Sequence, residues 1–101
     1  MDKIALDYAE KIKMKLKDNL IRIILFGSRA RGDNKDFSDY DFLIVLNDVN
    51  KYCKDTIIDE EVEILNKYDK LASTIVYSSN EWENIKKFPL GINILKEGIN
   101  L

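Results

Sequence analysis

Two apolar segments of similar length constrain the fold of this chain most strongly. Leu20–Phe26 consists of large apolar side chains interrupted only by Arg22, and Tyr40–Leu46 is rich in Ile, Val and Phe. Such runs are typical of strands buried on both faces, which requires helices on both sides of a sheet. The two segments therefore predict an α/β fold.

Apolar residues at three- or four-residue spacing predict the helices around these strands. Ser78, with Glu81 three residues later, resembles a capping box that opens a helix, and Pro89 follows as a stop. The predicted order is a helix over about 2–18, strands over 20–26 and 40–46, a helix over about 55–68, a strand over 71–77, a helix over about 79–87 and a short tail helix that ends near Gly98. This order predicts a small mixed β-sheet flanked by helices.

The predicted helix over 55–68 has both apolar and acidic residues. Its apolar residues recur every three or four positions: Ile57, Ile58, Val62, Leu65 and Tyr68. Its acidic residues are Glu60, Glu61 and Glu63. Because consecutive helical residues diverge around the axis, the glutamates are interpreted as a solvated helix face rather than a metal cluster.

The residue types exclude several kinds of chemistry. The chain has 101 residues, 46% of them apolar, with one Cys and no His, which suits a single domain over 1–101. The missing histidine excludes Ser-His and Cys-His nucleophile pairs, imidazole bases and zinc sites with imidazole ligands. Cys53 has no disulfide partner, and neither a signal peptide nor a membrane-spanning run is recognisable, so we expect a cytoplasmic protein.

The segment with the most chemical information begins where the first predicted strand ends. It reads Gly27-Ser28-Arg29-Ala30-Arg31-Gly32-Asp33. Glycine permits a tight turn and a close backbone approach, and a short helix from Ser28 would direct free N–H groups at an anion. The guanidinium groups of Arg29 and Arg31 suit phosphate oxygens. The segment predicts a phosphate-binding turn, although Gly-Ser after a strand also occurs in plain turns.

Two carboxylates stand at the start of the second apolar strand. Residues i and i+2 of a strand point to the same face, so the side chains of Asp39 and Asp41 are expected to converge. Two like charges so close together need a cation between them. Mg²⁺ suits this place because it prefers oxygen ligands and is often held by one or two carboxylates plus substrate phosphates. The alternative is that Asp39 caps a turn and Asp41 lies at a solvated strand end.

The two halves together resemble a known family. Gly27-Ser28, ten intervening residues, and Asp39-x-Asp41 leading into Phe42-Leu43-Ile44-Val45 closely resemble the signature of the DNA polymerase beta-like nucleotidyltransferase superfamily. The form Gly-Ser-Arg-Ala-Arg-Gly-Asp resembles its minimal nucleotidyltransferase branch. The element order is similar over essentially the whole chain, and the motif itself spans 27–45. The resemblance implies a palm-like mixed sheet flanked by helices.

The resemblance also implies a reaction. An acceptor hydroxyl attacks the α-phosphorus of an NTP, with AMP from ATP as the expected transfer, and pyrophosphate leaves. Transferred by position, the phosphates would be held by Gly27 and Ser28, with Arg29 or Arg31 adding charge, and Mg²⁺ by the catalytic pair Asp39 and Asp41. In that scheme the metal activates the attacking oxygen and neutralises the leaving one.

The chain departs from the family where a third carboxylate is usual, on the next strand. Strand register places that position near Ser73, and no Asp or Glu lies within Leu71–Tyr77. Asp69 is the nearest upstream acid, but four residues of strand span about 13 Å. We interpret Asp69 as a helix-end or turn residue and expect slow or partner-dependent transfer.

The family and the charge distribution suggest a protein partner. Many minimal members resemble antitoxins that pair with a helical HEPN ribonuclease toxin, so the expected acceptor is a side-chain hydroxyl of that toxin; a homo-oligomer is also possible. Residues 37–69 carry 3 basic and 9 acidic side chains, a net charge of −6, which disfavours a nucleic-acid partner. The alternative function is a weak or inactive nucleotide-binding protein that neutralises its partner by binding.

Overall fold

The computed structural model describes residues 2–101, which form a four-stranded mixed sheet with helices on both faces. The helices are α1 (Lys3–Leu16), a 3-10 turn (Lys17–Asn19), α2 (Ser28–Arg31), α3 (Lys51–Tyr68), α4 (Ser79–Ile85) and α5 (Pro89–Glu97). The strands are β1 (Leu20–Phe26), β2 (Tyr40–Leu46), β3 (Ala72–Ser78) and β4 (Ile99–Asn100). The predicted α/β class and mixed sheet are confirmed.

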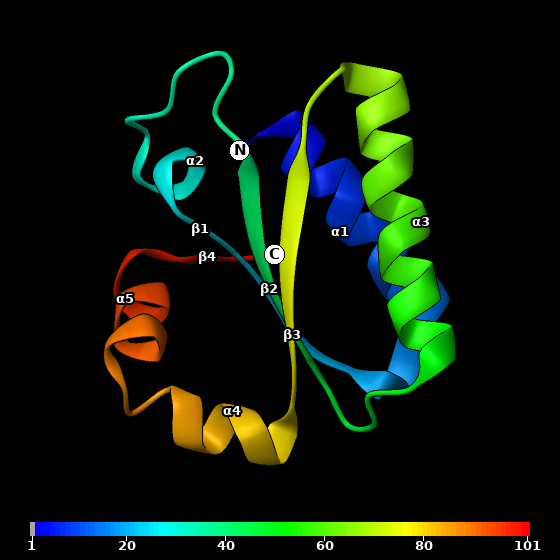
Figure 1. Ribbon diagram of the computed structural model, residues 1–101, viewed down its shortest axis with the longest axis vertical. Coiled ribbons are helices and arrows are strands. Elements are labelled where there is room, and N and C mark those ends of the chain that lie inside the picture. Colours follow the sequence, from blue (N-terminus) through cyan, green and yellow to red (C-terminus); the bar gives the residue numbers. More distant parts are fainter. Residues whose placement is uncertain (1) are drawn as a thin grey trace.

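The strand order is β3-β2-β1-β4. β1 pairs antiparallel with β2 and with β4, whereas β2 and β3 are parallel. In Figure 1, α1 and α3 lie on one side of the strands, and α4 and α5 lie on the other. The strand boundaries predicted over 20–26 and 40–46 are confirmed, and the two strands are neighbours in the sheet.

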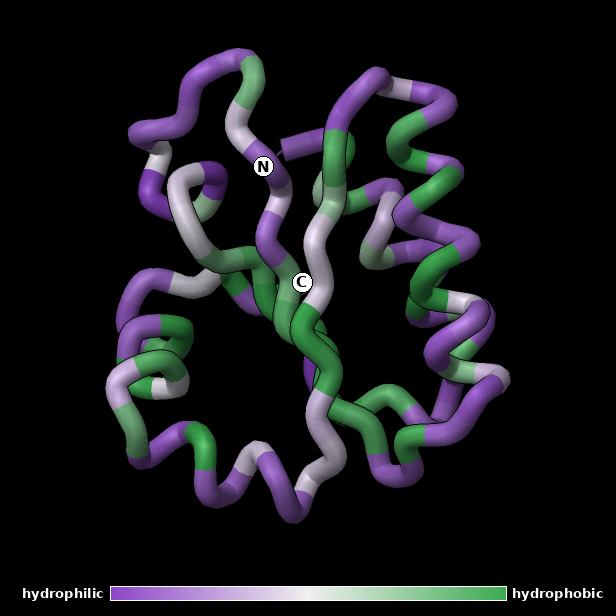
Figure 2. The backbone as a smooth tube through the Cα atoms, in the orientation of Figure 1, coloured by the Kyte–Doolittle hydropathy of each residue, from purple (hydrophilic) through white to green (hydrophobic). Residues whose placement is uncertain are grey.

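Both faces of the sheet are buried in separate apolar layers. Phe42 and Ile44 of β2 pack with α1 and α3, where the ring of Tyr8 stacks on Phe42 with 4.2 Å between centroids. Leu43 and Val45 point the other way and pack against Trp82 of α4 and the α5 side chains. Figure 2 shows the hydrophobic residues concentrated along the central strands and hydrophilic ones in the loop after α2. Alternate residues of one strand therefore supply both cores.

The C-terminal third differs from the prediction in two respects. The capping box of Ser78 and Glu81 is present and opens α4, as predicted. Pro89 not only follows that helix but occupies the first turn of α5, where its missing N–H costs nothing. The tail then adds the short strand β4, which the sequence did not reveal because two residues carry no periodic pattern.

Helix α3 corrects the interpretation of its acidic and apolar residues. It begins at Lys51, with the side chain of Asn50 accepting a hydrogen bond from the Cys53 N–H, and is one turn longer than predicted. Glu60 is not solvated: it is buried and accepts a hydrogen bond of 2.6 Å from the Lys15 ammonium on α1. Conversely, three residues of the apolar series are exposed: Ile58, Val62 and Leu65.

No helix within residues 2–101 is long and apolar enough to cross a membrane.

The burial of α3 can be checked with two adjacent isoleucines. Ile57 is 3% exposed and Ile58 is 54% exposed. We expect Ile57→Ala to lower the free energy of unfolding by about 2–5 kcal/mol because it leaves a cavity in the core. Ile58→Ala is the matched control and should change it by less than about 0.5 kcal/mol. Urea denaturation followed by circular dichroism measures both, and equal losses would contradict this placement of the helix.

Candidate functional site

The predicted turn and the predicted carboxylates meet where β1 ends and β2 begins. Phe26 and Asp41 are paired residues of the antiparallel ladder, so Gly27 lies directly beside the Asp41 carboxylate. Gly27 has φ +75°, a conformation that L side chains rarely adopt, and a Cβ at this position would overlap the Asp41 carboxylate. Only glycine lets the chain turn so close to this acid.

The single helical turn α2 follows Gly27 at once. The N–H groups of Ala30 and Arg31 both donate to the Gly27 carbonyl, at 3.1 and 3.0 Å. Gly32 ends the turn in the left-handed conformation. The turn brings Arg31 close enough to Asp41 for its positive charge to favour the ionised carboxylate. Two predicted site residues from either side of the loop are thus neighbours in space.

The surroundings of the Asp41 carboxyl disfavour its ionised form. Burial raises its pKa above the usual value, repulsion from Asp39 raises it further, and Arg31 partly offsets both effects. Within residues 2–101 no group of three or more His, Cys, Asp or Glu side chains gathers in a way that would hold a metal ion alone. Two carboxylates suit a Mg²⁺ ion whose remaining ligands are water and substrate phosphates. The residues present therefore fit a metal that arrives with a nucleotide.

The position expected for a third acid lies beside Asp41. In the parallel ladder Ser73 of β3 pairs with Asp41, so the expected register is confirmed and an exposed serine stands where the family resemblance implies a carboxylate. Asp69 is the C-cap of α3 with φ +56°, which confirms its interpretation as a helix-end residue. It nevertheless lines, together with Asp39, an open cavity of about 470 Å³. Asp69 and Asp39 therefore face the same open cavity, although they belong to different segments of the chain.

Arg29 points to the loop after α2. Its guanidinium donates to the Ser38 carbonyl at 3.0 and 3.2 Å and to the Asp36 carbonyl at 3.2 Å, and it lies 4.5 Å from the centre of the Tyr40 ring. These contacts hold the loop that leads into Asp39. A contact of Arg29 with a nucleotide stays a prediction.

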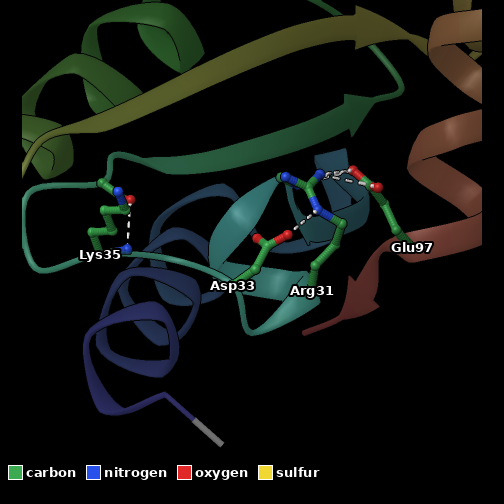
Figure 3. A network of polar contacts seen from close by, with 6 residues as sticks. Arg31, Asp33, Lys35 and Glu97 are labelled. Atoms are coloured by element: carbon green, nitrogen blue, oxygen red, sulfur yellow. Dashed lines mark hydrogen bonds and ion pairs between the residues drawn. The ribbon is translucent and has the colours of Figure 1, made fainter.

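Glu97 is a residue of this site that the sequence did not indicate. Its carboxylate accepts a hydrogen bond from the Gly27 N–H at 3.2 Å. It also accepts from Nη1 of Arg31 at 3.1 and 3.2 Å, while Nε of Arg31 donates to Asp33 at 3.2 Å (Figure 3). Glu97 lies 66 residues after Arg31 in the chain. No local pattern links residues so far apart, so only the fold could reveal the contact.

Comparison with known proteins identifies the class to which this site belongs. Residues 8–100 match the nucleotidyltransferase domain family, and the chain belongs to that family. It is 35% identical over 97 residues to the "Putative protein adenylyltransferase MJ0604" of Methanocaldococcus jannaschii, covering 96% of this chain and 93% of that protein.

Solved structures share the fold. A crystal structure titled as a nucleotidyltransferase from Sulfolobus solfataricus superposes with a TM-score of 0.55 at 23% identity, covering 97% of this chain and 76% of the other. A chain of a toxin-antitoxin crystallised with AMP-PNP gives a TM-score of 0.62 at 14% identity, covering 93% and 69%. At these identities the likeness shows the palm-like arrangement of sheet and helices.

The raised pKa of Asp41 predicts that this carboxylate destabilises the protein without nucleotide. Because the folded-state pKa lies above 3.8, the folded protein binds the proton more tightly than the unfolded chain, and stability is lost as pH rises through the folded pKa. Asp41→Asn should therefore melt at a higher temperature than wild type at pH 7.5. The difference should shrink as pH falls toward 4. The exposed Asp59→Asn is the control, and a lower melting temperature for Asp41→Asn at pH 7.5 would contradict the expectation.

Proposed function

We propose that this protein transfers a nucleoside monophosphate, AMP from ATP, to a hydroxyl group of another molecule. The observation that carries the proposal is the meeting of the Gly27 turn, Arg31 and the Asp39/Asp41 pair at one end of the sheet. A glycine turn with a guanidinium suits phosphates, and two carboxylates suit a divalent cation. Family membership and the adenylyltransferase name of a 35% identical relative support the same reaction.

Each residue has a distinct part in this proposal. Ser28 and the backbone of Gly27 face the β- and γ-phosphates, and Arg31 supplies positive charge there. Asp39 and Asp41 hold Mg²⁺, which when bound stabilises the charge that develops on the attacking and leaving oxygens. Arg29 keeps the loop before Asp39 in place through the Ser38 carbonyl. The chain thus orients the nucleotide from one strand end and the metal from the next.

The reaction forms one bond and breaks one. The acceptor oxygen bonds to the α-phosphorus, the bridge from the α- to the β-phosphate breaks, and pyrophosphate leaves. The hydroxyl proton must pass to a base or to water, and Ser73, which pairs with Asp41, offers no carboxylate to receive it. We infer that transfer by the isolated chain is slow and that a carboxylate of the partner, or Asp69, assists.

We propose that the acceptor is a side chain of a helical toxin of the HEPN type, with this protein as its antitoxin. A structural neighbour at a TM-score of 0.62 is part of a toxin-antitoxin. The acidic segment 37–69, which includes Asp39 and Asp41, has a net charge of −6 and disfavours nucleic acid as the acceptor.

A second candidate function is neutralisation of the partner by binding alone. The serine beside Asp41 favours it, because a site without the third acid still binds nucleotide and partner. The two candidates differ in one measurable product, an adenylyl group on the partner.

The metal-binding role predicts a loss of nucleotide binding in Asp39→Asn/Asp41→Asn. Wild type should bind ATP in calorimetry only with Mg²⁺, and adding Mg²⁺ should not increase the ATP affinity of the double variant.

The proposed acceptor predicts an adenylylated partner. The protein encoded by the neighbouring gene should gain the mass of AMP after incubation with this protein, ATP and Mg²⁺, as measured by intact mass spectrometry. Transfer of AMP to a free nucleotide or an antibiotic, with no AMP on the partner protein and no stable complex with it, would indicate a small-molecule transferase instead.

The phosphate role predicts weaker ATP binding in Arg31→Ala. We expect a loss of roughly ten- to a hundred-fold in affinity, the usual size for one charged hydrogen bond to an anion. Lys87→Ala, an exposed position on another part of the chain, is the control. Unchanged affinity in Arg31→Ala would remove this residue from the phosphate site.

The missing acid predicts a gain of activity in Ser73→Asp. A carboxylate on the strand position paired with Asp41 should raise the transfer rate, because it adds a proton acceptor and a metal ligand. Ser79→Asp at the start of α4 is the matched control. An unchanged rate in Ser73→Asp, with fast wild-type transfer lost in Asp69→Asn, would show that Asp69 is the third acid.

A further inference from the structure

The carboxylate of Glu97 occupies hydrogen-bond donors of the proposed phosphate site. It accepts hydrogen bonds from Nη1 of Arg31 (Figure 3). It also accepts one from the backbone N–H of Gly27. A backbone N–H carries one proton, so the Gly27 donor is shared between Glu97 and any phosphate that approaches it. The site therefore already holds an anion of its own.

The backbone at Glu97 is fixed beside the Gly27 turn. Gly98 donates its N–H to the Ile94 carbonyl at 2.8 Å, and a Cβ on Gly98 would overlap that carbonyl and the Ile24 side chain. Ile99 then pairs with Leu25 of β1, two residues before Gly27. By contrast, the side chain of Glu97 is 26% exposed. The side chain can leave its partners while the backbone stays in place.

The position of Glu97 excludes it as a substitute for the missing third acid. In the strand order β3-β2-β1-β4, Glu97 precedes β4 and contacts the end of β1. Ser73 is on β3, across β2 from that contact. Glu97 therefore lies on the β1 side of β2, where phosphates would bind, and not on the β3 side, where Ser73 pairs with Asp41.

The charges around Arg31 favour discrimination between anions. Arg31 is bound by two carboxylates, those of Asp33 and Glu97, so its positive charge is already more than balanced. An anion without cations gains little by entering, because it must displace Glu97 and meet the charges of Asp39 and Asp41. A triphosphate that carries a divalent cation brings the compensating charge with it.

Resting on the proposed function, we propose that Glu97 determines which anion the nucleotide site accepts. Its carboxylate is exchanged for the phosphates of a metal-bound nucleotide and takes back the Gly27 N–H and Arg31 when pyrophosphate leaves. The residue thereby selects metal-bound nucleotide over anions that carry no cation.

The test compares wild type with Glu97→Gln, which keeps the shape of the side chain and removes its charge. Calorimetry measures binding of pyrophosphate in EDTA and of ATP with Mg²⁺. We expect Glu97→Gln to bind free pyrophosphate at least about ten-fold more tightly, with a smaller gain for ATP with Mg²⁺. Glu97→Ala, which frees the same donors, should show the same order of effects, and thermal melting checks that both variants fold.

Asp33→Asn is the matched control, because Asp33 also neutralises Arg31 but has no contact with Gly27. The affinity of Asp33→Asn for free pyrophosphate should rise less than that of Glu97→Gln. An equal rise would show that release of the Gly27 N–H by Glu97 is not what controls pyrophosphate binding. Weaker or unchanged pyrophosphate binding in Glu97→Gln would overturn the proposal and leave Glu97 as a positioning residue for Arg31. After either of these results, the proposed nucleotidyl transfer still stands as long as wild type binds ATP with Mg²⁺. If neither wild type nor any variant binds ATP with Mg²⁺, both the proposed function and the role of Glu97 are wrong.

Discussion

The antiparallel pairing of β1 with β2 is the constraint on which the site depends. Because Phe26, the last residue of β1, pairs with Asp41, the residue after the strand meets a carboxylate and must be glycine. The same turn starts α2, which returns Arg31 to the neighbourhood of Asp41. The ends of the 13-residue segment between the two strands therefore lie close together, and the Gly27 turn and the Asp39/Asp41 pair share one end of the sheet.

The two buried faces of β2 make this pairing rigid. Its alternate side chains enter two apolar layers, one under α1 and α3 and one under α4 and α5. A slip of one residue would exchange the layers and move Asp41 to the other face, so register is strongly specified. The rigid strand holds a carboxylate whose pKa is raised by burial and by Asp39. Such a cluster of unfavourable charge is typical of a site that is completed by a cation and a substrate.

The acidic contacts divide the site into two sides. On the side of β4, Glu97 and Asp33 bind Arg31. On the side of β3, Ser73 pairs with Asp41, and Asp69 lines a cavity with Asp39. A nucleotide and an acceptor would approach from these two sides. The β1 side offers a guanidinium and backbone N–H groups, whereas the residue paired with Asp41 on the β3 side is a serine without a carboxylate.

The sequence by itself determined the central strands, their apolar faces and the motif from Gly27 to Asp41, because these are local patterns of spacing and residue type. It also predicted the register that places Ser73 beside Asp41, which the parallel pairing of β2 and β3 confirms. Tertiary structure decided which face of α3 is buried: Glu60 finds Lys15 on α1, while Ile58 faces solvent. It also decided the contact of Glu97 with Gly27, because pairing of β4 with β1 unites segments that no pattern along the chain connects.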